Sequence, residues 1–301
     1  AEFSIDDKSS TNEPSTVTVN IRGRADDQVI YSFTETILHP RHYHPVEIRP
    51  CAVFFTRSFN FDHQNNVPLP EYRAELWKYN YTGTGVPIVL LGEGSDDASQ
   101  TVTRYYNNDF RTRVDGKYIA LTRGSRGDKV HGLAIVSPQV EGELYSVEHN
   151  TILDQYPELV GTIVLSNWTS DGRYFWVRIS DGPYVTGWIS VDTREWSHEV
   201  YVAPRGVLGG YPLNGNTGWI PRMEGVFYPM SESDTEEERT RRAATGETTS
   251  LYLYNVLTQA ELLVEATEEP LWMGLGAGWL SDTTLRYRTP TGEQKEFVLP
   301  E

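Results

Sequence analysis

At positions 170–177 the chain reads Ser-Asp-Gly-Arg-Tyr-Phe-Trp-Val, and at positions 114–121 it reads Val-Asp-Gly-Lys-Tyr-Ile-Ala-Leu. In both segments an Asp-Gly pair comes before an alternating apolar run. Asp-Gly favours a tight turn, because glycine tolerates positive φ and aspartate hydrogen-bonds to its own backbone. The alternating run predicts a strand with one buried face. The chain therefore repeats a unit made of a turn and a strand.

A strand–turn–strand pattern also recurs along the chain. Its copies are 75–80 with 86–90, 133–136 with 143–147, 188–191 with 199–202, and 251–254 with 261–264. The equivalent positions Leu76, Leu133, Ile189 and Tyr252 are separated by 57, 56 and 63 residues. A period of this length, with several strands in each repeat, predicts an all-β protein with the β-propeller fold, in which each repeat is one blade.

The expected inner strands lie near positions 46, 103, 163, 219 and 275, which gives five blades of four antiparallel strands. The last repeat is one strand short, with strands near 272–279, 284–288 and 294–299. The N-terminal region has one strand too many, at 28–38. We therefore expect residues 28–38 to pair with the last blade and close the ring, which removes an open sheet edge. An open β-sandwich, or a fragment of a six- or seven-bladed ring, is the alternative.

Two polar segments depart from this pattern. Residues 1–16 contain little that could be buried and are expected to form a disordered tail. Residues 231–249 carry runs of glutamate and arginine and are expected to form an exposed charged insertion. The remaining chain, 17–301, is expected to be a single domain.

The repeated motifs resemble those of a known family. The Asp-Gly-Lys/Arg-Tyr strand, Glu-Leu-Trp-Lys-Tyr-Asn at 75–80 and Leu-Tyr-Leu-Tyr-Asn at 251–255 look like TolB-type or WD40-like propeller repeats. Such repeats also form the propeller of prolyl-oligopeptidase-type peptidases. Those families usually show Ser-Pro-Asp-Gly, whereas positions 113–116 and 169–172 have no proline. The resemblance covers residues 70–290 and implies a fold, leaving the function open.

Composition excludes several classes of function. The formal net charge is −16, which disfavours nucleic acid and anionic membranes as partners. The single cysteine, Cys51, excludes an internal disulfide, and no apolar run is long enough for a transmembrane helix. The residues Ala1-Glu2-Phe3 resemble a remnant of the restriction site of a secretion vector. We therefore expect an extracellular, periplasmic or cell-surface protein. We also expect a monomer.

Candidate ligand-binding residues lie at the ends of the expected inner strands. Trp168 and Trp219 could stack on a sugar ring or fill a pocket of a partner, and packing between blades is the alternative for both. Asn108 and Arg222 are the polar candidates. These residues would bind a protein, peptide or glycan at the rim or in the axial funnel.

Two carboxylates are candidates for catalysis. Glycoside hydrolysis needs two carboxyl groups, one of them kept protonated, and Asp109 and Glu224 are the candidates near the predicted axis. Asp115, Asp171 and Asp282 are expected to form turns. The segment 124–127, Gly-Ser-Arg-Gly, is not the Gly-x-Ser-x-Gly elbow of serine hydrolases.

A histidine cluster suggests a metal as a third possibility. His39, His42 and His44 lie close together in the sequence, and Glu47 follows. In an extended segment His42 and His44 share a face, so with Glu47 they could hold a divalent metal such as Zn²⁺. Pro40 and Pro45 favour an ordinary linker instead. No other cofactor is expected.

We therefore expect a non-catalytic, secreted or cell-surface binding module for a protein, peptide or glycan. The alternatives are a glycan-active hydrolase that uses funnel carboxylates and a metal-binding protein that uses the histidine cluster. A rigid scaffold that presents variable loops suits the first function.

Overall fold

The structure is a computed structural model of the whole chain. It describes residues 2–6, 15–22, 29–37, 43–50, 52–62, 67–80, 85–94, 101–103, 105–124, 130–182, 184–204, 207, 212–224, 249–267, 278–288 and 293–300. These residues form antiparallel sheets and one short helix, which confirms the all-β prediction. The chain divides into two compact units, Ala1–Gln155 and Tyr156–Glu301.

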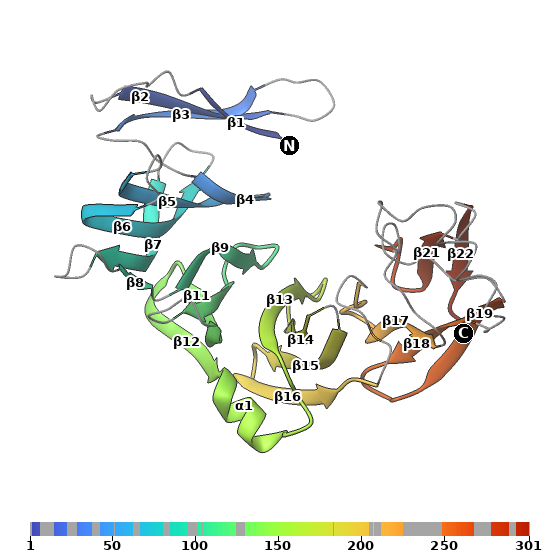
Figure 1. Cartoon of the computed structure of the whole chain (residues 1–301). Helices are drawn as coiled ribbons and strands as arrows, with labels where there is room; N and C mark the ends of the chain where they lie inside the picture. The colour runs from blue at the N-terminus through green and yellow to red at the C-terminus, as the bar shows by residue number, and fades with distance from the viewer. Residues whose placement is uncertain are drawn as a thin grey trace, which may run out of the picture. The chain divides into compact units, whose positions relative to one another are not determined.

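The described residues of the first unit form three antiparallel sheets (Figure 1). The first sheet consists of β1 (Glu2–Asp6), β2 (Ser15–Arg22) and β3 (Val29–Ile37). The second consists of β4 (Tyr43–Arg49), β5 (Ala52–Asp62), β6 (Val67–Asn80), β7 (Gly85–Gly94) and β8 (Thr101–Thr103). The third consists of β9 (Tyr105–Thr112), β10 (Ile119–Gly124), β11 (Val130–Ser137) and β12 (Val140–Glu148). The helix α1 (His149–Gln155) follows β12.

In the second unit the strands that the structure describes also form three antiparallel sheets. The first consists of β13 (Thr162–Trp168), β14 (Tyr174–Asp181), β15 (Tyr184–Asp192) and β16 (Ser197–Val202). The second consists of β17 (Trp219–Glu224), β18 (Thr249–Asn255) and β19 (Glu261–Thr267). The third consists of β20 (Gly278–Trp279), β21 (Thr284–Arg288) and β22 (Gln294–Val298).

The predicted turn repeat is confirmed in atomic detail. Gly116 has φ 66° and Gly172 has φ 67°, the conformation that favours glycine. In the first turn the Arg113 amide donates to the Tyr118 carbonyl at 2.8 Å, and in the second the Thr169 amide donates to the Tyr174 carbonyl at 2.9 Å. The two segments therefore form the same hairpin turn, as their sequences predict.

Each unit has an apolar core between neighbouring sheets. In the first unit Phe54, Leu76, Phe110 and Leu121 are fully buried in one cluster that joins the second and third sheets. In the second unit one cluster draws on all three sheets, with these members among others: Trp176, Trp188, Ile220, Leu253 and Leu285. Sheets that bury both faces against neighbours are what a propeller repeat requires.

The predicted closure of the ring by residues 28–38 is not confirmed. β3 pairs with β2 along its whole length, and β22 pairs with β21. No closed sheet occurs among the strands that the structure describes. A physical reason favours the observed pairing: β2 and β3 are close in sequence, so joining them costs little loop-closure entropy, whereas pairing with β22 would close almost the whole chain.

Three further predictions concern the N-terminal tail, the charged insertion and membrane-spanning helices. Residues 2–6, which were expected to lie in a disordered tail, form β1 and pair with β2. The charged insertion, 231–249, lies outside the described residues except for Thr249, the first residue of β18. In the described part of the chain no helix is long and apolar enough to cross a membrane.

Candidate functional site

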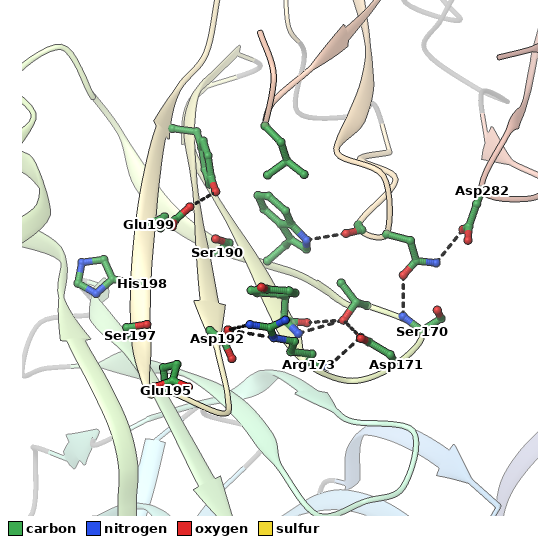
Figure 2. A pocket seen from close by; sticks show the side chains of 17 residues that line it. Ser170, Asp171, Arg173, Ser190, Asp192, Glu195, Ser197, His198, Glu199 and Asp282 are labelled. Carbon is green, nitrogen blue, oxygen red and sulfur yellow. Dashed lines mark hydrogen bonds and ion pairs between the residues drawn. The ribbon is translucent and has the colours of Figure 1, made fainter. Parts of the chain in front are cut away.

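A cavity of about 610 Å³ lies in the second unit, on one face of the sheet β13–β16 (Figure 2). Its floor is formed by side chains of β14, β15 and β16. Its rim is formed by the β13–β14 turn, by the segment before β17, and by Leu257 and Asp282 from two further turns. A volume of this size falls within the range of small-ligand sites, which is about 300–1,000 Å³.

Strand register explains which side chains form the floor. Tyr174 of β14 pairs with Asp192 of β15, and Asp192 pairs with Ser197 of β16. Two residues further along, a second row across the same strands consists of Trp176, Ser190 and Glu199. Paired residues share a face, and so do residues two apart on a strand. The two rows, together with Tyr201, therefore face the cavity and are called the floor residues below.

One end of this sheet face is apolar and the other is polar. Trp176 and Trp188 are almost fully buried, and they belong to the core cluster of the unit. The indole Nε1 of Trp176 donates to the Gly215 carbonyl at 2.9 Å, which holds the ring beneath the rim. The cavity therefore begins where the apolar contact between sheets ends and polar side chains replace it.

The β13–β14 turn orients the carboxylate of Asp171. The hydroxyl of Thr169 donates to Asp171 Oδ1 at 2.6 Å, and the amide of Arg173 donates to the same oxygen at 2.9 Å. These hydrogen bonds, that of Thr169 above all, hold the pKa of Asp171 below its usual value. Asp171 forms the turn as predicted, and it also lines the cavity.

Arg173 and Asp192 form an ion pair on the cavity floor. Arg173 Nη2 donates to Asp192 Oδ2 at 2.6 Å and Nε donates to the same oxygen at 3.0 Å. Burial acts to raise the pKa of Asp192, but the hydrogen bonds from Arg173 and the Arg194 amide outweigh it, so the pKa lies below its ordinary value. The guanidinium of Arg173 also lies over the Tyr174 ring, 4.7 Å from its centroid.

A second polar pair lies on β16. The hydroxyl of Tyr201 donates to Glu199 Oε2 at 2.5 Å, and burial, followed by this carboxylate, raises the pKa of Tyr201 to about 12. Tyr201 is therefore a protonated donor at neutral pH. His198 also lines the cavity, but it pairs with Val191 on the opposite face of the strand, and Figure 2 shows it apart from Glu199. Burial lowers the pKa of His198, which favours its neutral form.

Asn216 holds the rim together. Its Oδ1 accepts a hydrogen bond from the Ser170 amide at 2.7 Å, and its Nδ2 donates to Asp282 Oδ1 at 2.7 Å (Figure 2). The neighbouring Asn214 donates from Nδ2 to the Asp282 carbonyl at 3.0 Å. Two asparagines before β17 thus connect the turns of the two other sheets.

The predicted aromatic and arginine candidates lie outside the cavity lining. Trp168 packs on Phe175, with ring centroids 4.8 Å apart, and Trp219 is half-buried against the core. Arg222 lies over the Tyr252 ring at 5.5 Å and pairs with Glu261 at 3.1 Å. In the structure these three side chains therefore make packing and pairing contacts within their own sheets or with the core.

The other candidates are described only in part. Asn108, Asp109 and Glu224 lie in strands, but their side chains are outside the described residues, as is that of His44. His39 and His42 are outside the described residues altogether.

Glu47 is described in detail. Its Oε2 accepts from the Thr112 amide at 2.7 Å and pairs with Arg49 at 2.8 Å, which links β4 to β9. Among the described residues no group of three or more His, Cys, Asp or Glu side chains could hold a metal ion.

The acidic and tyrosine side chains of the floor were not predicted from the sequence. Of the acidic lining residues only Asp171 and Asp282 were considered, and both were interpreted as turn formers. The available signal was the period of two along the strands, which places 174 with 176, 190 with 192, and 197 with 199 and 201. Bringing these three segments together required the register, which the sequence did not provide.

No protein-family model matches the chain, and no curated protein matches it in sequence. Among solved structures, an oligogalacturonate lyase in complex with manganese has a TM-score of 0.52 at 10% identity, over 95% of this chain and 72% of the lyase. The fold is that of a β-propeller. TolB from Acinetobacter baumannii has a TM-score of 0.43 at 12% identity, over 94% of this chain. The β-propeller domain of the Trilobed protease from Pyrococcus furiosus has a TM-score of 0.47 at 11% identity, over 86% of this chain and 68% of that domain.

The β-propeller fold predicted from the repeats is thus confirmed. The chain spans only 57% of the TolB chain that it matches. At 10% identity the similarity to the lyase concerns the fold alone and says nothing about the chemistry of the cavity.

Proposed function

We propose that this β-propeller is a non-catalytic binding module that holds a protein, peptide or glycan ligand in the cavity on the β13–β16 sheet. The observation that carries the proposal is the cavity itself, about 610 Å³ in volume, with a floor built on regular strands. Sites on strands are held more rigidly than sites on loops, so the floor is preorganised for a ligand.

The state of Asp171 and Asp192 favours binding over hydrolysis by this pair of carboxylates. A glycosidase needs one carboxyl group that stays protonated near neutral pH, which requires a raised pKa. In this cavity the shifts resolved for Asp171 and Asp192 are both downward, because each accepts hydrogen bonds from the turn or from Arg173. Both carboxylates are therefore ionised acceptors that hold the scaffold and the ligand in place.

The finer features of the architecture and location belong to the same proposal. We infer five blades, because five sheets, those that begin with β4, β9, β13, β17 and β20, follow the repeat read from the sequence. We also infer an extracellular, periplasmic or cell-surface location, which fractionation of the source cells would test.

The proposal is tested with a variant that fills the cavity. Ser197 is exposed on the edge strand β16 and lines the cavity, so Ser197→Trp should occupy the site without disturbing the core. Val202 lies on the same strand, is 40% exposed and is absent from the lining, so Val202→Trp is the matched control. Both variants should fold, which circular dichroism and thermal unfolding would check.

The probes are a phage-displayed library of random 12-residue peptides and an array of neutral and acidic glycans. We expect ligands that bind the wild type and the Val202→Trp variant equally and bind the Ser197→Trp variant at least tenfold more weakly. Ligands that bind all three proteins equally, or no ligand at all, would refute the proposal. Cleavage of a bound glycan by the wild type would refute its non-catalytic part.

A further inference from the structure

The charged side chains of the cavity lining are mostly acidic. Four of its donors are already engaged: Trp176 Nε1 donates to Gly215, Asn216 Nδ2 to Asp282, Tyr201 to Glu199, and Arg173 to Asp192. Among the described residues of the lining Arg173 is the only arginine or lysine. An anionic ligand that needed Arg173 would have to break its ion pair with Asp192.

Acceptors remain in excess. The carboxylates in the lining are Asp171, Asp192, Glu195, Glu199 and Asp282. A carboxylate has two oxygens and can accept about four hydrogen bonds, and the bonds described above use only part of this capacity. Glu195 and Glu199 are exposed, so their carboxylates can reach a ligand. A ligand that supplies donors would therefore satisfy the cavity without disturbing it.

A second observation comes from the aromatic rings. The guanidinium of the chain's own Arg173 lies over the face of Tyr174, 4.7 Å from its centroid, at the edge of the cavity. This contact shows that the sheet face accommodates a planar cation on an aromatic ring. Tyr201 provides another half-buried ring on the same face, beside Glu199. An aromatic ring beside a carboxylate is a suitable environment for a ligand cation.

We propose that the ligand presents a guanidinium or ammonium group, and specifically that the cavity binds an arginine or lysine side chain of a peptide. This inference rests on the proposed function and specifies its ligand. The cation would lie between Glu199 and Glu195, opposite the Arg173–Asp192 pair. The net charge of the protein, −16, would also attract a basic peptide at long range.

The probes are three capped tripeptides that differ in one side chain: acetyl-Gly-Arg-Gly-amide, acetyl-Gly-citrulline-Gly-amide and acetyl-Gly-Glu-Gly-amide. Citrulline has nearly the shape of arginine but no charge. Binding is followed by NMR at the indole N–H of Trp176, which is assigned with Trp176→Phe. We expect the arginine peptide to bind at least tenfold more tightly than the citrulline peptide, and the glutamate peptide not to bind.

Two variants locate the contact. Glu199→Gln should weaken binding of the arginine peptide about tenfold and leave the citrulline peptide unchanged, because one charge-assisted hydrogen bond is lost. Glu296→Gln is the matched control, because Glu296 pairs with Arg286 on β21 and does not line the cavity. It should leave both affinities unchanged.

Equal binding of the arginine and citrulline peptides, or an arginine affinity that Glu199→Gln leaves intact, would overturn the cation proposal. If library peptides still lose binding in Ser197→Trp, the cavity remains a binding site and only its ligand class is wrong. If Ser197→Trp affects no peptide and no glycan, the proposed function itself is wrong. The two failures are therefore separable.

Discussion

Asn216 should contribute to the stability of the second unit although its side chain is exposed. It accepts a hydrogen bond from the Ser170 amide and donates one to Asp282, each at 2.7 Å, and so connects turns of separate sheets. A hydrogen bond contributes about 0.5–1.5 kcal/mol, and exposure keeps both bonds near the lower end of this range. Asn216→Ala should therefore lower the free energy of unfolding by about 1–2 kcal/mol.

The amide of Asn216 can be tested atom by atom. Asn216→Asp keeps an acceptor for the Ser170 amide, but it replaces the donor with a negative charge facing Asp282. We expect it to be at least as destabilising as Asn216→Ala at low salt and to recover in high salt, because screening weakens repulsion between exposed charges. Adding Asp282→Ala should rescue Asn216→Asp and leave Asn216→Ala nearly unchanged.

The assay is urea unfolding followed by tryptophan fluorescence, with Asn167→Ala as the control. Asn167 is an exposed asparagine on β13 in the same unit and does not line the cavity, so its replacement should change the free energy of unfolding by less than about 0.5 kcal/mol. If Asn216→Ala changes stability no more than this control, the rim hydrogen bonds contribute nothing and the reasoning is refuted.

Further predictions concern the backbone, the core and the pH dependence of stability. Gly161→Ala should lower the free energy of unfolding by more than about 2 kcal/mol, because Gly161 has φ 115° and an added Cβ would lie 2.0 Å from a backbone carbonyl oxygen. Gly278→Ala should lower it by less than about 1 kcal/mol in the same urea assay, because an added Cβ there would meet open space. Leu253 is fully buried, so Leu253→Ala should lower the free energy of unfolding by about 2–5 kcal/mol. Leu263 is 55% exposed, and an equal loss of stability in Leu263→Ala would contradict the assigned core. The lowered pKa of Asp192 means that its ionised form stabilises the fold above the ordinary pKa of aspartate and that this contribution is lost as the pH falls through the lower folded value. Unfolding free energies measured from pH 7 to pH 2 should therefore fall more steeply for the wild type than for Asp192→Asn, and parallel curves would speak against the ion pair.

Local sequence patterns predicted the recurring turns and hairpins of this protein, although they missed β1 and α1. The Asp-Gly turns at 115–116 and 171–172 form as predicted, because positive φ at glycine is a property of a few neighbouring residues. The paired strands, such as β15 with β16 and β18 with β19, follow from alternating apolar residues and short connections. The repeat spacing of these hairpins also predicted the propeller architecture.

The cavity was decided by tertiary structure. Tyr174, Ser190 and Glu199 lie on three successive strands, and only the register of β14, β15 and β16 places them on one face. Residues 28–38 were expected to close the ring, but β3 pairs with its neighbour β2. Turns and hairpins depend on neighbouring residues, so the sequence predicts them. The cavity depends on the exact register of three strands and on rim turns that come from two other sheets, so only the tertiary structure decides it.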